Sequence, residues 1–506
     1  MIFKSVNILS FIAAAAMIVS CGDSKSNEPQ TPQNPGQNDN NQGGEAGAEA
    51  ADVWMLTTTS NRGSDLKQSY IEYKAGSSMA PSTIKLNPSE TFQTIDGFGG
   101  AITGSTAYNL LKMSQADRTA FLTETFSPSA GYGMSYIRVP IGCSDFSLSE
   151  YTLCDKPGIE NFALTDEETK YIIPVLKEIL AINPDIKILG SPWTAPKWMK
   201  VDNLSNLAPY DSWTSGQLNP AYYEDYGIYF VKWIEALADN GIKVYAVTPQ
   251  NEPLNRGNSA SMYMTWQEQR DFIKTGLGPK LRQAGLDTKI YAFDHNYNYD
   301  NISDQQSYPS KIYADAEASQ YIAGAAFHNY GGSVDELINV HNANPEKELV
   351  FTESTAGEWN DGANLETRLV DDMEQITLGT VNRWAKGAII WNLMLDANQG
   401  PNRPGGCTNG YGAVDLMSDN KSIRKNSFYY IMAHMSSVVK PDAVRIGTSG
   451  FSQPGLTYSA FRNTDGSYAL VLSNRNQNQV NITVDDGSHS FPVTIPGKGI
   501  VSLGWK

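Results

Sequence analysis

The stretch VTPQNEP, residues 247–253, decides the fold, because in it an apolar strand runs directly into an amide, an acid and a proline. The apolar residues Ala246 and Val247 are typical of a buried parallel strand. Pro253 ends regular pairing and stiffens the turn. Glu252 is thereby held at a strand end, where burial of a carboxylate is costly. An acid in such a place is either paired with another charge or used in chemistry.

Seven similar apolar runs surround this one, and helix-like segments separate them. The eight runs cover residues 95–102, 134–142, 186–193, 243–250, 289–296, 322–330, 348–355 and 387–395. Between two of them, apolar residues at 226, 230, 233, 234 and 237 form one face of a helix. This alternation predicts a (β/α)8 TIM barrel over residues 96–432. A doubly wound open sheet is the alternative, but GFGGA lacks the GxGxxG spacing of dinucleotide-binding folds.

The segments that flank the barrel region are rich in short strand-like runs. Residues 433–506 include LTYSAFRNTDGSYALVLSNRN, which predicts two strands joined by an Asn-Thr-Asp-Gly turn. Residues 52–95 are also strand-like and could complete the same domain. We therefore expect a side β-sandwich that draws on both chain ends.

The N-terminal residues predict an exported, lipidated protein. Residues 1–20 combine a positive start at Lys4 with a short apolar run that ends before Cys21. This pattern indicates a bacterial lipoprotein signal peptide, cleaved before Cys21 and followed by lipidation of its thiol; an ordinary signal peptide is the alternative. Residues 21–51 contain no large apolar residue and predict a disordered tether. We expect a membrane-anchored lipoprotein outside the cytoplasm, on the cell surface or the periplasmic face.

Composition narrows the class of partner. The net charge is −16, from 38 Lys and Arg against 54 Asp and Glu, which argues against nucleic acid and anionic membranes and suits a neutral ligand. Three cysteines remain after Cys21, an odd number, so we favour free thiols, although Cys143 and Cys154 could pair. No CxxC or His/Cys cluster has metal-ligand spacing, so we predict no metal and no cofactor. We expect a monomer.

Two acids end strands that a barrel would bring to one rim. Glu252 ends the fourth strand and Glu353 ends the seventh. The carboxyl ends of barrel strands meet at one face, where active sites form. Two carboxylates across a cleft are the apparatus of glycoside hydrolysis, one protonating the leaving oxygen and the other attacking the anomeric carbon. Mutual repulsion and burial are expected to help hold the proton on the acid.

Other polar and aromatic residues end the remaining strands. Arg138 could pair with a carboxylate, and Glu353 is a candidate that such a pair would keep ionised. Trp193 could form the wall for a sugar ring or belong to the core. His328 could contact substrate or be a satisfied core histidine. The further candidates for substrate binding are Asp145, Asn251, His295, Tyr330, Trp391 and Asn402.

Long motifs in order along the chain resemble glycoside hydrolase family 30, the family of lysosomal glucosylceramidase. They include FQTIDGFGGAIT, YIRVPIGCSDFSLSEYT, LGSPWTAPKWMK, AVTPQNEP, HNYGG, FTES and IIWNLMLDANQGPN. The resemblance implies a (β/α)8 barrel with a side β-sandwich and a retaining mechanism. It implies that Glu252 is the acid/base and Glu353 the nucleophile. It also implies that the −1 subsite is lined by Asp145, Trp193, Asn251, Trp391 and Asn402.

The loops after strands 4, 5 and 6 depart from glucosylceramidase and resemble the endo-β-1,6-glucanase branch of the family. We therefore expect endo-hydrolysis of β-1,6-glucan (pustulan). The alternatives are a glucosylceramidase-like exo-β-glucosidase, a β-xylanase, and a surface glycan-binding lipoprotein without catalysis. Polar and aromatic residues expected in the +1 site are Asn255, Arg256, Asn258, His295, Asn296, Tyr297 and Asn298.

Overall fold

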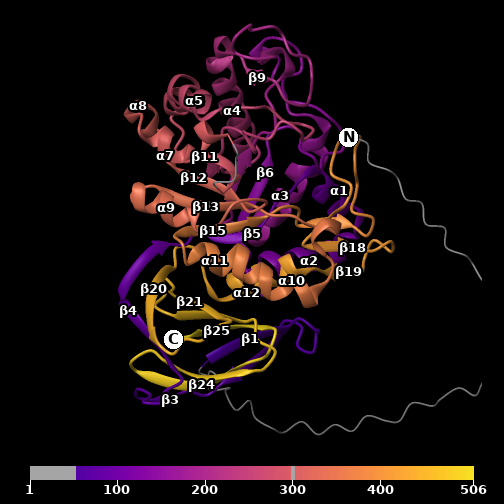
Figure 1. The fold of residues 1–506 in the computed structure, drawn as a ribbon. Coiled ribbons are helices and arrows are strands. Elements are labelled where there is room, and N and C mark those ends of the chain that lie inside the picture. The colour runs from indigo at the N-terminus through magenta and orange to yellow at the C-terminus, as the bar shows by residue number, and fades with distance from the viewer. Residues whose placement is uncertain (1–52, 298–301) are drawn as a thin grey trace, which may run out of the picture. The chain divides into compact units, whose positions relative to one another are not determined.

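A computed structural model describes residues 53–297 and 302–506 (Figure 1). The predicted Cys21 lipidation site, the signal peptide, the tether and Asn298 lie outside the described residues. Within residues 53–297 and 302–506, no helix is both long enough and apolar enough to cross a membrane. Cys143, Cys154 and Cys407 are free thiols, as the sequence favoured.

Eight parallel strands form the barrel, one from each of the eight apolar runs. In spatial order they are β5 (Gly97–Gly100), β15 (Ala385–Ile390), β13 (Glu348–Glu353), β12 (Ile322–His328), β11 (Lys289–Asn296), β10 (Ala246–Val247), β7 (Lys187–Ser191) and β6 (Tyr136–Pro140). The two end strands, β5 and β6, meet through a parallel bridge between Ala101 and Arg138 and through the bond from Ser135 N to Phe98 O (2.9 Å). The predicted barrel is therefore confirmed.

Helices cover the outside of the barrel (Figure 1). They are α1 (Gly104–Lys112), α2 (Gln115–Phe126), α3 (Ile173–Ile182), α4 (Tyr223–Ala238), α5 (Trp266–Phe272), α6 (Gly278–Gln283), α7 (Tyr308–Tyr313), α8 (Ala316–Ser319), α9 (Glu336–Ala343), α10 (Leu365–Asp372), α11 (Leu378–Val381) and α12 (Ser427–Val438). The predicted apolar face of α4 is buried throughout. A capping box between Thr265 and Glu268 fixes the start of α5. Because α12 continues to Val438, the expected barrel boundary at residue 432 falls inside this helix.

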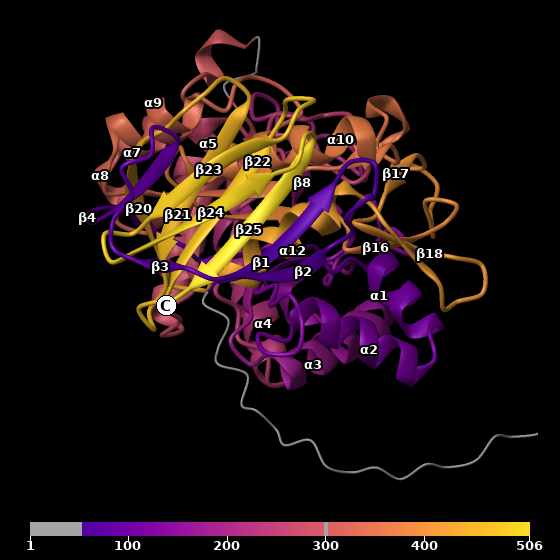
Figure 2. The same ribbon diagram turned by 90° about the horizontal axis from the view of Figure 1, so that it is seen from below.

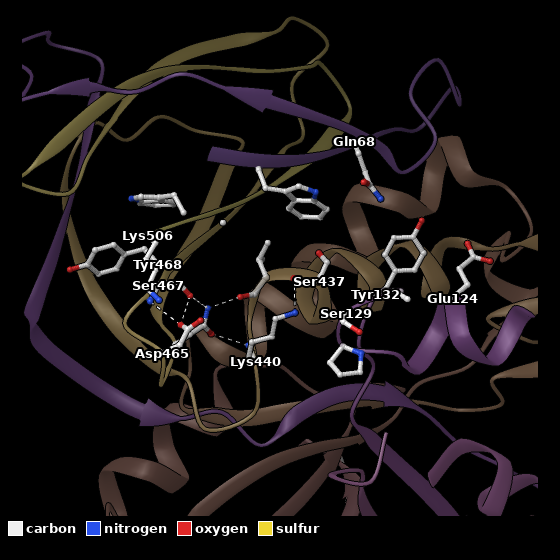
Figure 3. A pocket seen from close by; sticks show the side chains of 18 of the residues that line it. Gln68, Glu124, Ser129, Tyr132, Ser437, Lys440, Asp465, Ser467, Tyr468 and Lys506 are labelled. Carbon is white, nitrogen blue, oxygen red and sulfur yellow. Dashed lines mark hydrogen bonds between the residues drawn. The ribbon is translucent and has the colours of Figure 1, made fainter. Parts of the chain in front are cut away.

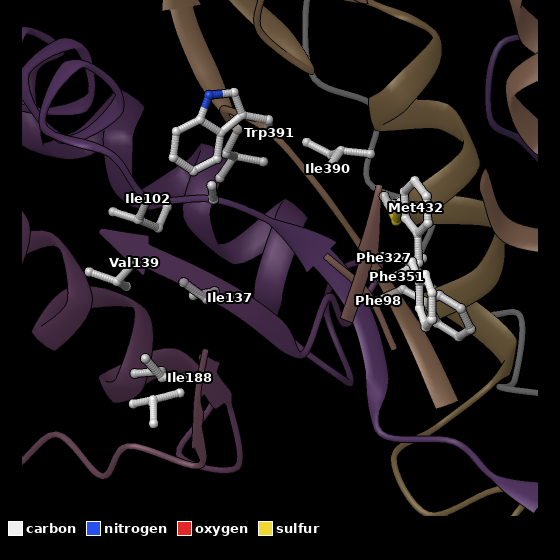
Figure 4. Packing of buried hydrophobic residues seen from close by; sticks show 14 of the residues in the cluster. Phe98, Ile102, Ile137, Val139, Ile188, Phe327, Phe351, Ile390, Trp391 and Met432 are labelled. Atoms are coloured by element: carbon white, nitrogen blue, oxygen red, sulfur yellow. The ribbon is translucent and has the colours of Figure 1, made fainter. Parts of the chain in front are cut away.

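Alternation along the strands separates two sets of core residues. On β6, Ile137 and Val139 point outward and join the large core between strands and helices. Figure 4 shows Phe98, Phe327 and Phe351 grouped beside Met432 of α12 in that core. The inward-facing residues form a separate layer that fills the barrel: Tyr136, Leu189, Ala246, Tyr291, Ala326, Val350 and Ile389.

Both chain ends build the side domain, as expected. Its strands are β1 (Val53–Thr59), β2 (Lys67–Ile71), β3 (Lys74–Ala75), β4 (Thr83–Thr94), β20 (Val444–Gly450), β21 (Leu456–Arg462), β22 (Tyr468–Asn474), β23 (Val480–Asp485), β24 (His489–Ile495) and β25 (Gly499–Trp505). Strand β1 pairs with β25, and the long β4 pairs with both β20 and β23 (Figure 2). These strands enclose a core of their own, a β-sandwich.

Short two- and three-residue strands lie in the segments that follow barrel strands β7, β13 and β15. They are β8 (Lys200–Val201), β9 (Gln217–Leu218), β14 (Ala356–Gly357), β16 (Met394–Asp396), β17 (Gly410–Tyr411), β18 (Val414–Leu416) and β19 (Ile423–Lys425). The bond network of buried His434 ties the sandwich to α12, since its ring nitrogens lie 2.8 Å from Ser502 Oγ and 2.9 Å from Thr58 Oγ1.

Candidate active site

The polar end of the barrel follows from the two-residue period of its strands. Residues two positions beyond the apolar inner layer face the same interior. On six strands these positions hold Arg138, Ser191, Thr248, His328, Thr352 and Trp391. On β11 a register shift and left-handed φ values of 72° at Phe293 and 66° at Asp294 bring Asp294 to this level. The interior therefore changes from apolar to charged at the carboxyl ends of the strands.

Asp294 is the centre of this polar layer and is fully buried. Its carboxylate oxygens contact Arg138 (2.8 Å), Ser191 (2.8 Å), Thr248 (2.6 Å), Thr352 (2.6 Å) and His328 Nε2 (3.0 Å). Burial would raise its pKa, but the charge of Arg138 and the hydrogen bond from His328 hold that pKa far below the usual range. Asp294 is therefore an anion that fixes the orientation of Arg138 and His328.

Glu353 ends β13 beside Arg138. The guanidinium Nη1 donates to Glu353 Oε2, and Nη2 donates to Asn251 Oδ1 at 2.8 Å. The hydroxyl of Tyr330 lies 2.9 Å from Glu353 Oε1. The ion pair between Arg138 and Glu353 that the sequence suggested is therefore present. A fixed guanidinium fork orients the carboxylate and supplies its counter-charge.

Glu252 follows β10 in the left-handed region, with φ 45°, and its backbone N–H donates to Asp294 O at 2.9 Å. Such a backbone costs a non-glycine residue of order 1–3 kcal/mol and persists only where the surroundings impose it. Asn255 Nδ2 (2.8 Å) and Asn258 Nδ2 (3.0 Å) donate to Glu252 Oε2. These two amides, which were expected to hold the sugar, thus also aim the carboxylate.

Two imidazoles face the other oxygen of Glu252. His328 Nδ1 lies 3.3 Å and His295 Nδ1 3.8 Å from Glu252 Oε1. Both rings are buried beneath the carboxylate. One continuous chain of contacts therefore runs from Glu252 through His328, Asp294 and Arg138 to Glu353, joining the two candidate catalytic acids.

The protonation of the substrate-free site differs from the expectation. Burial would raise the pKa of Glu252, but the hydrogen bond from His328 and the charges of His295 and His328 lower it to about 2. Burial raises the pKa of Glu353 and outweighs the lowering effect of His328 and Arg138, so the expectation that the pair with Arg138 keeps this carboxyl ionised is not met in the substrate-free site. Against burial, the carboxylates of Glu353, Asp294 and Glu252 raise the pKa of His328 to about 9. The proton next to Glu252 therefore resides on His328, and repulsion between the two glutamates does not hold it on the acid.

Trp193 and Trp391 stack on each other, with ring centroids 4.8 Å apart and an interplanar angle of 23°. The guanidinium of Arg138 lies over both rings. Trp391 Nε1 donates to Asp145 Oδ1 at 3.2 Å. Trp193 is only 2% exposed, so in this structure its faces pack on Trp391 and Arg138 rather than lining an open wall. Burial and the charges of Glu353 and Glu252 raise the pKa of Asp145 to about 7.

A cleft of about 350 Å³ contains both glutamates. Its lining residues are Asp145, Glu252, Asn255, Asn258, Asn296, Tyr330, Glu353, Thr355, Trp359 and Cys407. Trp359, which is 52% exposed at the rim, was not predicted from the sequence; no strand-end signal marks it, because it lies in the short 3-10 helix Glu358–Asn360 after β14. Thr355, whose hydroxyl lies 2.8 Å from that of Tyr330, ends the seventh apolar run, where the sequence analysis singled out only Glu353.

Several predicted residues do not line this cleft. Asn402 is exposed, and its assignment to the −1 subsite stays a prediction. Tyr297 is buried against Phe327, so the expectation that it stacks on a sugar in the +1 site is wrong in this structure. The guanidinium of Arg256 lies over the ring of Tyr263, 3.6 Å from its centroid.

Glu252, His295 and His328 offer three ligand atoms within 4.8 Å of one another, a grouping that could hold a metal ion. The sequence predicted no metal, and the hydrogen bonds argue the same way. Both nitrogens of His328 face carboxylates, and Glu252 Oε2 is already held by Asn255 and Asn258. The arrangement suits a proton-sharing pair better than a ligand set.

Comparison with known proteins agrees with this geometry. Residues 95–439 match the glycosyl hydrolase family 30 TIM-barrel domain, and residues 442–503 match the glycosyl hydrolase family 30 β-sandwich domain. An endo-1,6-β-D-glucanase of Neurospora crassa is 35% identical over 426 residues, covering 80% of this chain and 83% of its own. The lysosomal acid glucosylceramidase of Mus musculus is 28% identical over 452 residues, covering 84% of this chain and 83% of its own.

Among solved structures, the endo-β1,6-glucanase BT3312 superposes with a TM-score of 0.88 and is 63% identical, covering 90% of this chain and 99% of its own. Two of the family-30 motifs noted in the sequence, AVTPQNEP and FTES, carry the two glutamates, and the matched domains cover residues 95–439 and 442–503. The chain therefore belongs to glycoside hydrolase family 30 and is a glycoside hydrolase.

Proposed function

We propose that this protein is a retaining endo-β-1,6-glucanase that cleaves β-1,6-glucan by double displacement. The observation that carries the proposal is the 63% identity, over 90% of the chain, to a solved endo-β1,6-glucanase. The two buried glutamates in one cleft supply the chemistry that such a reaction needs.

The residues divide the reaction into two displacements. Glu353 attacks the anomeric carbon, the bond to the leaving O6 breaks, and that oxygen takes a proton from Glu252, which draws it from His328 at 3.3 Å. A water then attacks the same carbon while Glu252 accepts its proton, and the Glu353 carboxylate is released. Two inversions restore the β configuration. Arg138 and Tyr330 hold Glu353 throughout, since both contact it before substrate arrives.

Asn251 is suited to hold the sugar 2-hydroxyl. Its Oδ1 accepts from Arg138, which leaves the amide Nδ2 to serve as a donor. Asp145, with its pKa near 7, can accept or donate at another hydroxyl. These contacts would fix the ring so that its anomeric carbon faces Glu353.

The cleft rim favours a sugar over a lipid as leaving group. Beyond Glu252 it presents Asn255, Asn258 and Asn296, with one exposed indole at Trp359. Amides and a single aromatic face bind a hydroxylated ring, whereas a ceramide tail would need a contiguous apolar patch. This supports β-1,6-glucan over glucosylceramide.

We also propose that the enzyme works outside the cytoplasm as a lipoprotein, anchored through Cys21 and monomeric. The apolar N-terminal run before Cys21 and the polar stretch after it support an anchor with a spacer. Metabolic labelling with a radioactive fatty acid in a bacterial host should mark the wild type and leave Cys21→Ala unlabelled; a labelled Cys21→Ala would contradict the anchor.

The substrate is tested by product analysis on a panel of β-1,2-, β-1,3-, β-1,4- and β-1,6-glucans, xylan and glucosylceramide. We expect gentio-oligosaccharides of mixed length early in the digestion of pustulan. Faster turnover of xylan or glucosylceramide than of pustulan would refute the linkage. Glucose as the sole early product would refute endo action.

A further inference from the structure

A second cavity lies where the sandwich meets the helices below the barrel (Figure 3). Its volume is about 840 Å³, within the range of ligand sites. We call it the sandwich pocket, and define it by Trp54, Gln68, Tyr132, Lys440, Tyr468 and Trp505. The loop at 128–132 that forms one side precedes β6, so this side lies at the amino-terminal end of the barrel, opposite the catalytic cleft.

Strand ends give the sandwich pocket its aromatic lining. Strand β1 begins at Val53, β22 begins at Tyr468 and β25 ends at Trp505, and these three strands are neighbours. Trp54 pairs with Gly504 and Tyr468 with Trp505, so side chains from opposite faces of the sheet reach one mouth. The rings of Tyr468 and Trp505 are 5.7 Å apart.

The indole of Trp505 is fixed by contacts behind it. Trp505 Nε1 donates to Asp486 Oδ2 at 2.8 Å, and Phe491 packs edge-on against the indole at 5.1 Å. On the opposite side of the pocket, burial and the charge of Glu124 raise the pKa of Tyr132 to about 12, so this phenol stays neutral. Trp505 is buried and forms the back of the pocket, whereas Trp54, Tyr132 and Tyr468 are half-buried and offer surface on which a ligand can stack.

The polar groups around the rings carry no net charge. Lys440 and Lys506 are balanced by Glu124 and Asp465. Lys440 Nζ donates to Ser437 O at 2.8 Å, and Ser467 Oγ donates to Asp465 Oδ1 at 2.6 Å. Figure 3 shows Gln68, Ser129 and Tyr132 along one side of the cavity and Asp465, Ser467 and Tyr468 along the other. A balanced set of donors and acceptors does not select an anion, and with flat apolar faces it suits a neutral polyhydroxylated chain.

We propose that the sandwich pocket binds a neutral glucan segment, as a second site that holds the enzyme on its polymer. The inference rests on the proposed function for the identity of that polymer. Because the pocket and the catalytic glutamates lie at opposite ends of the barrel, the bound segment is not the one being cleaved. The site therefore raises affinity for long chains and leaves the cleavage of short ones unchanged.

The second site can be tested by native gel electrophoresis in gels that contain pustulan. The full chain is used, inactivated by Glu353→Gln, and its retention in the gel is measured. Trp54→Ala should weaken retention about fivefold, the size expected for loss of one stacking surface. Met79→Ala is the control, since Met79 is an exposed apolar residue between β3 and β4 of the sandwich and does not line the pocket. If Trp54→Ala is less stable by thermal melting, the exposed pair Gln68→Ala and Asp465→Ala replaces it, with the same expectation.

Kinetics of the active enzyme give the second readout. Trp54→Ala should raise KM for pustulan about fivefold, with kcat unchanged, and leave kcat/KM for gentiotriose within about twofold of wild type. Equal retention of Trp54→Ala and wild type, or an equal loss in Met79→Ala, overturns the proposal.

Gels with laminarin, hydroxyethylcellulose and xylan separate the two claims. If pustulan is not hydrolysed but Trp54→Ala loses retention on another neutral glucan, the proposed linkage fails and the second site stands. If pustulan is hydrolysed and the pocket variants bind every polymer like wild type, the second site fails and the proposed function stands.

Discussion

Replacing His328 by Asn should make hydrolysis sensitive to pH in a range where the wild type is not. In the wild type, Glu252 and His328 share one proton, and the pair keeps it until the pH approaches 9, the value about which His328 titrates. The amide introduced by His328→Asn cannot carry that proton, so only Glu252 can hold it in the variant.

The magnitude follows from the separation of the two groups. At 3.3 Å, the attraction between an imidazolium and a carboxylate is about 1.3 kcal/mol in bulk water and about 5 kcal/mol at an effective dielectric constant of 20. Opposite charges this close shift a pKa by about 1–3 units. Loss of the imidazolium should therefore raise the pKa of Glu252 from about 2 to about 3–5.

The variant would then hold no proton beside the leaving oxygen at neutral pH, whereas the wild type holds one on the Glu252–His328 pair. We expect kcat/KM for pustulan at pH 7 to fall about 100-fold or more in His328→Asn. The difference from wild type should shrink toward pH 4, because Glu252 in the variant holds a proton only below about pH 5. An aryl glucoside with a good leaving group needs little protonation and should lose much less at pH 7.

The assay is the pH dependence of kcat/KM for both substrates between pH 4 and 9. His341→Asn is the control, since His341 stacks on Trp384 on the outer surface and contacts neither glutamate. The shared proton would be refuted if the basic limb of the pH profile of kcat/KM were the same in His328→Asn and wild type. It would also be refuted if His328→Asn lost kcat/KM by the same factor at every pH and on both substrates.

Three further predictions concern the glutamates, metals and acid stability. Glu353→Gln should abolish turnover of every substrate, whereas Glu252→Ala should retain activity on activated aryl glucosides; equal loss on all substrates in Glu252→Ala would contradict its role as acid. Activity should survive exhaustive EDTA dialysis, and a loss that a divalent ion restores would mean that Glu252, His295 and His328 bind a metal. Burial lowers the pKa of His434 to about 3, so its neutral form stabilises the fold fully above pH 6.5, and this stability is lost as the pH falls toward 3. By pH 5 the free energy of unfolding should be about 2 kcal/mol lower than at pH 7.5. Urea unfolding at the two pH values should show this decrease in wild type but not in His434→Gln, and an equal decrease in both proteins would refute the role of His434.

The sequence was most informative where chemistry follows a local pattern. Apolar runs of parallel-strand length predicted all eight barrel strands, and the acids that end two of them, Glu252 and Glu353, lie in one cleft. The pairing of Arg138 with Glu353 could be suggested because both lie at the carboxyl ends of barrel strands, which meet at one face.

The other features of the fold and the site depend on contacts between residues far apart in the chain, for which a single sequence carries no local signal. The register shift on β11 turns Asp294 into the centre of the polar layer, and His328 holds its proton because of three carboxylates that are distant in the chain. Trp359 lies in a three-residue 3-10 helix, which is too short for a periodic pattern to mark it. The pairing of β4 with both β20 and β23 joins segments more than 340 residues apart, which local propensity cannot predict.

The most direct test of the proposed function is proton NMR of pustulan during its first minutes of digestion. We expect gentio-oligosaccharides of mixed length whose new reducing ends appear first as the β-anomer and only later equilibrate with the α-anomer. An α-anomer as the first product, or intact pustulan beside rapid cleavage of another polymer, would contradict it.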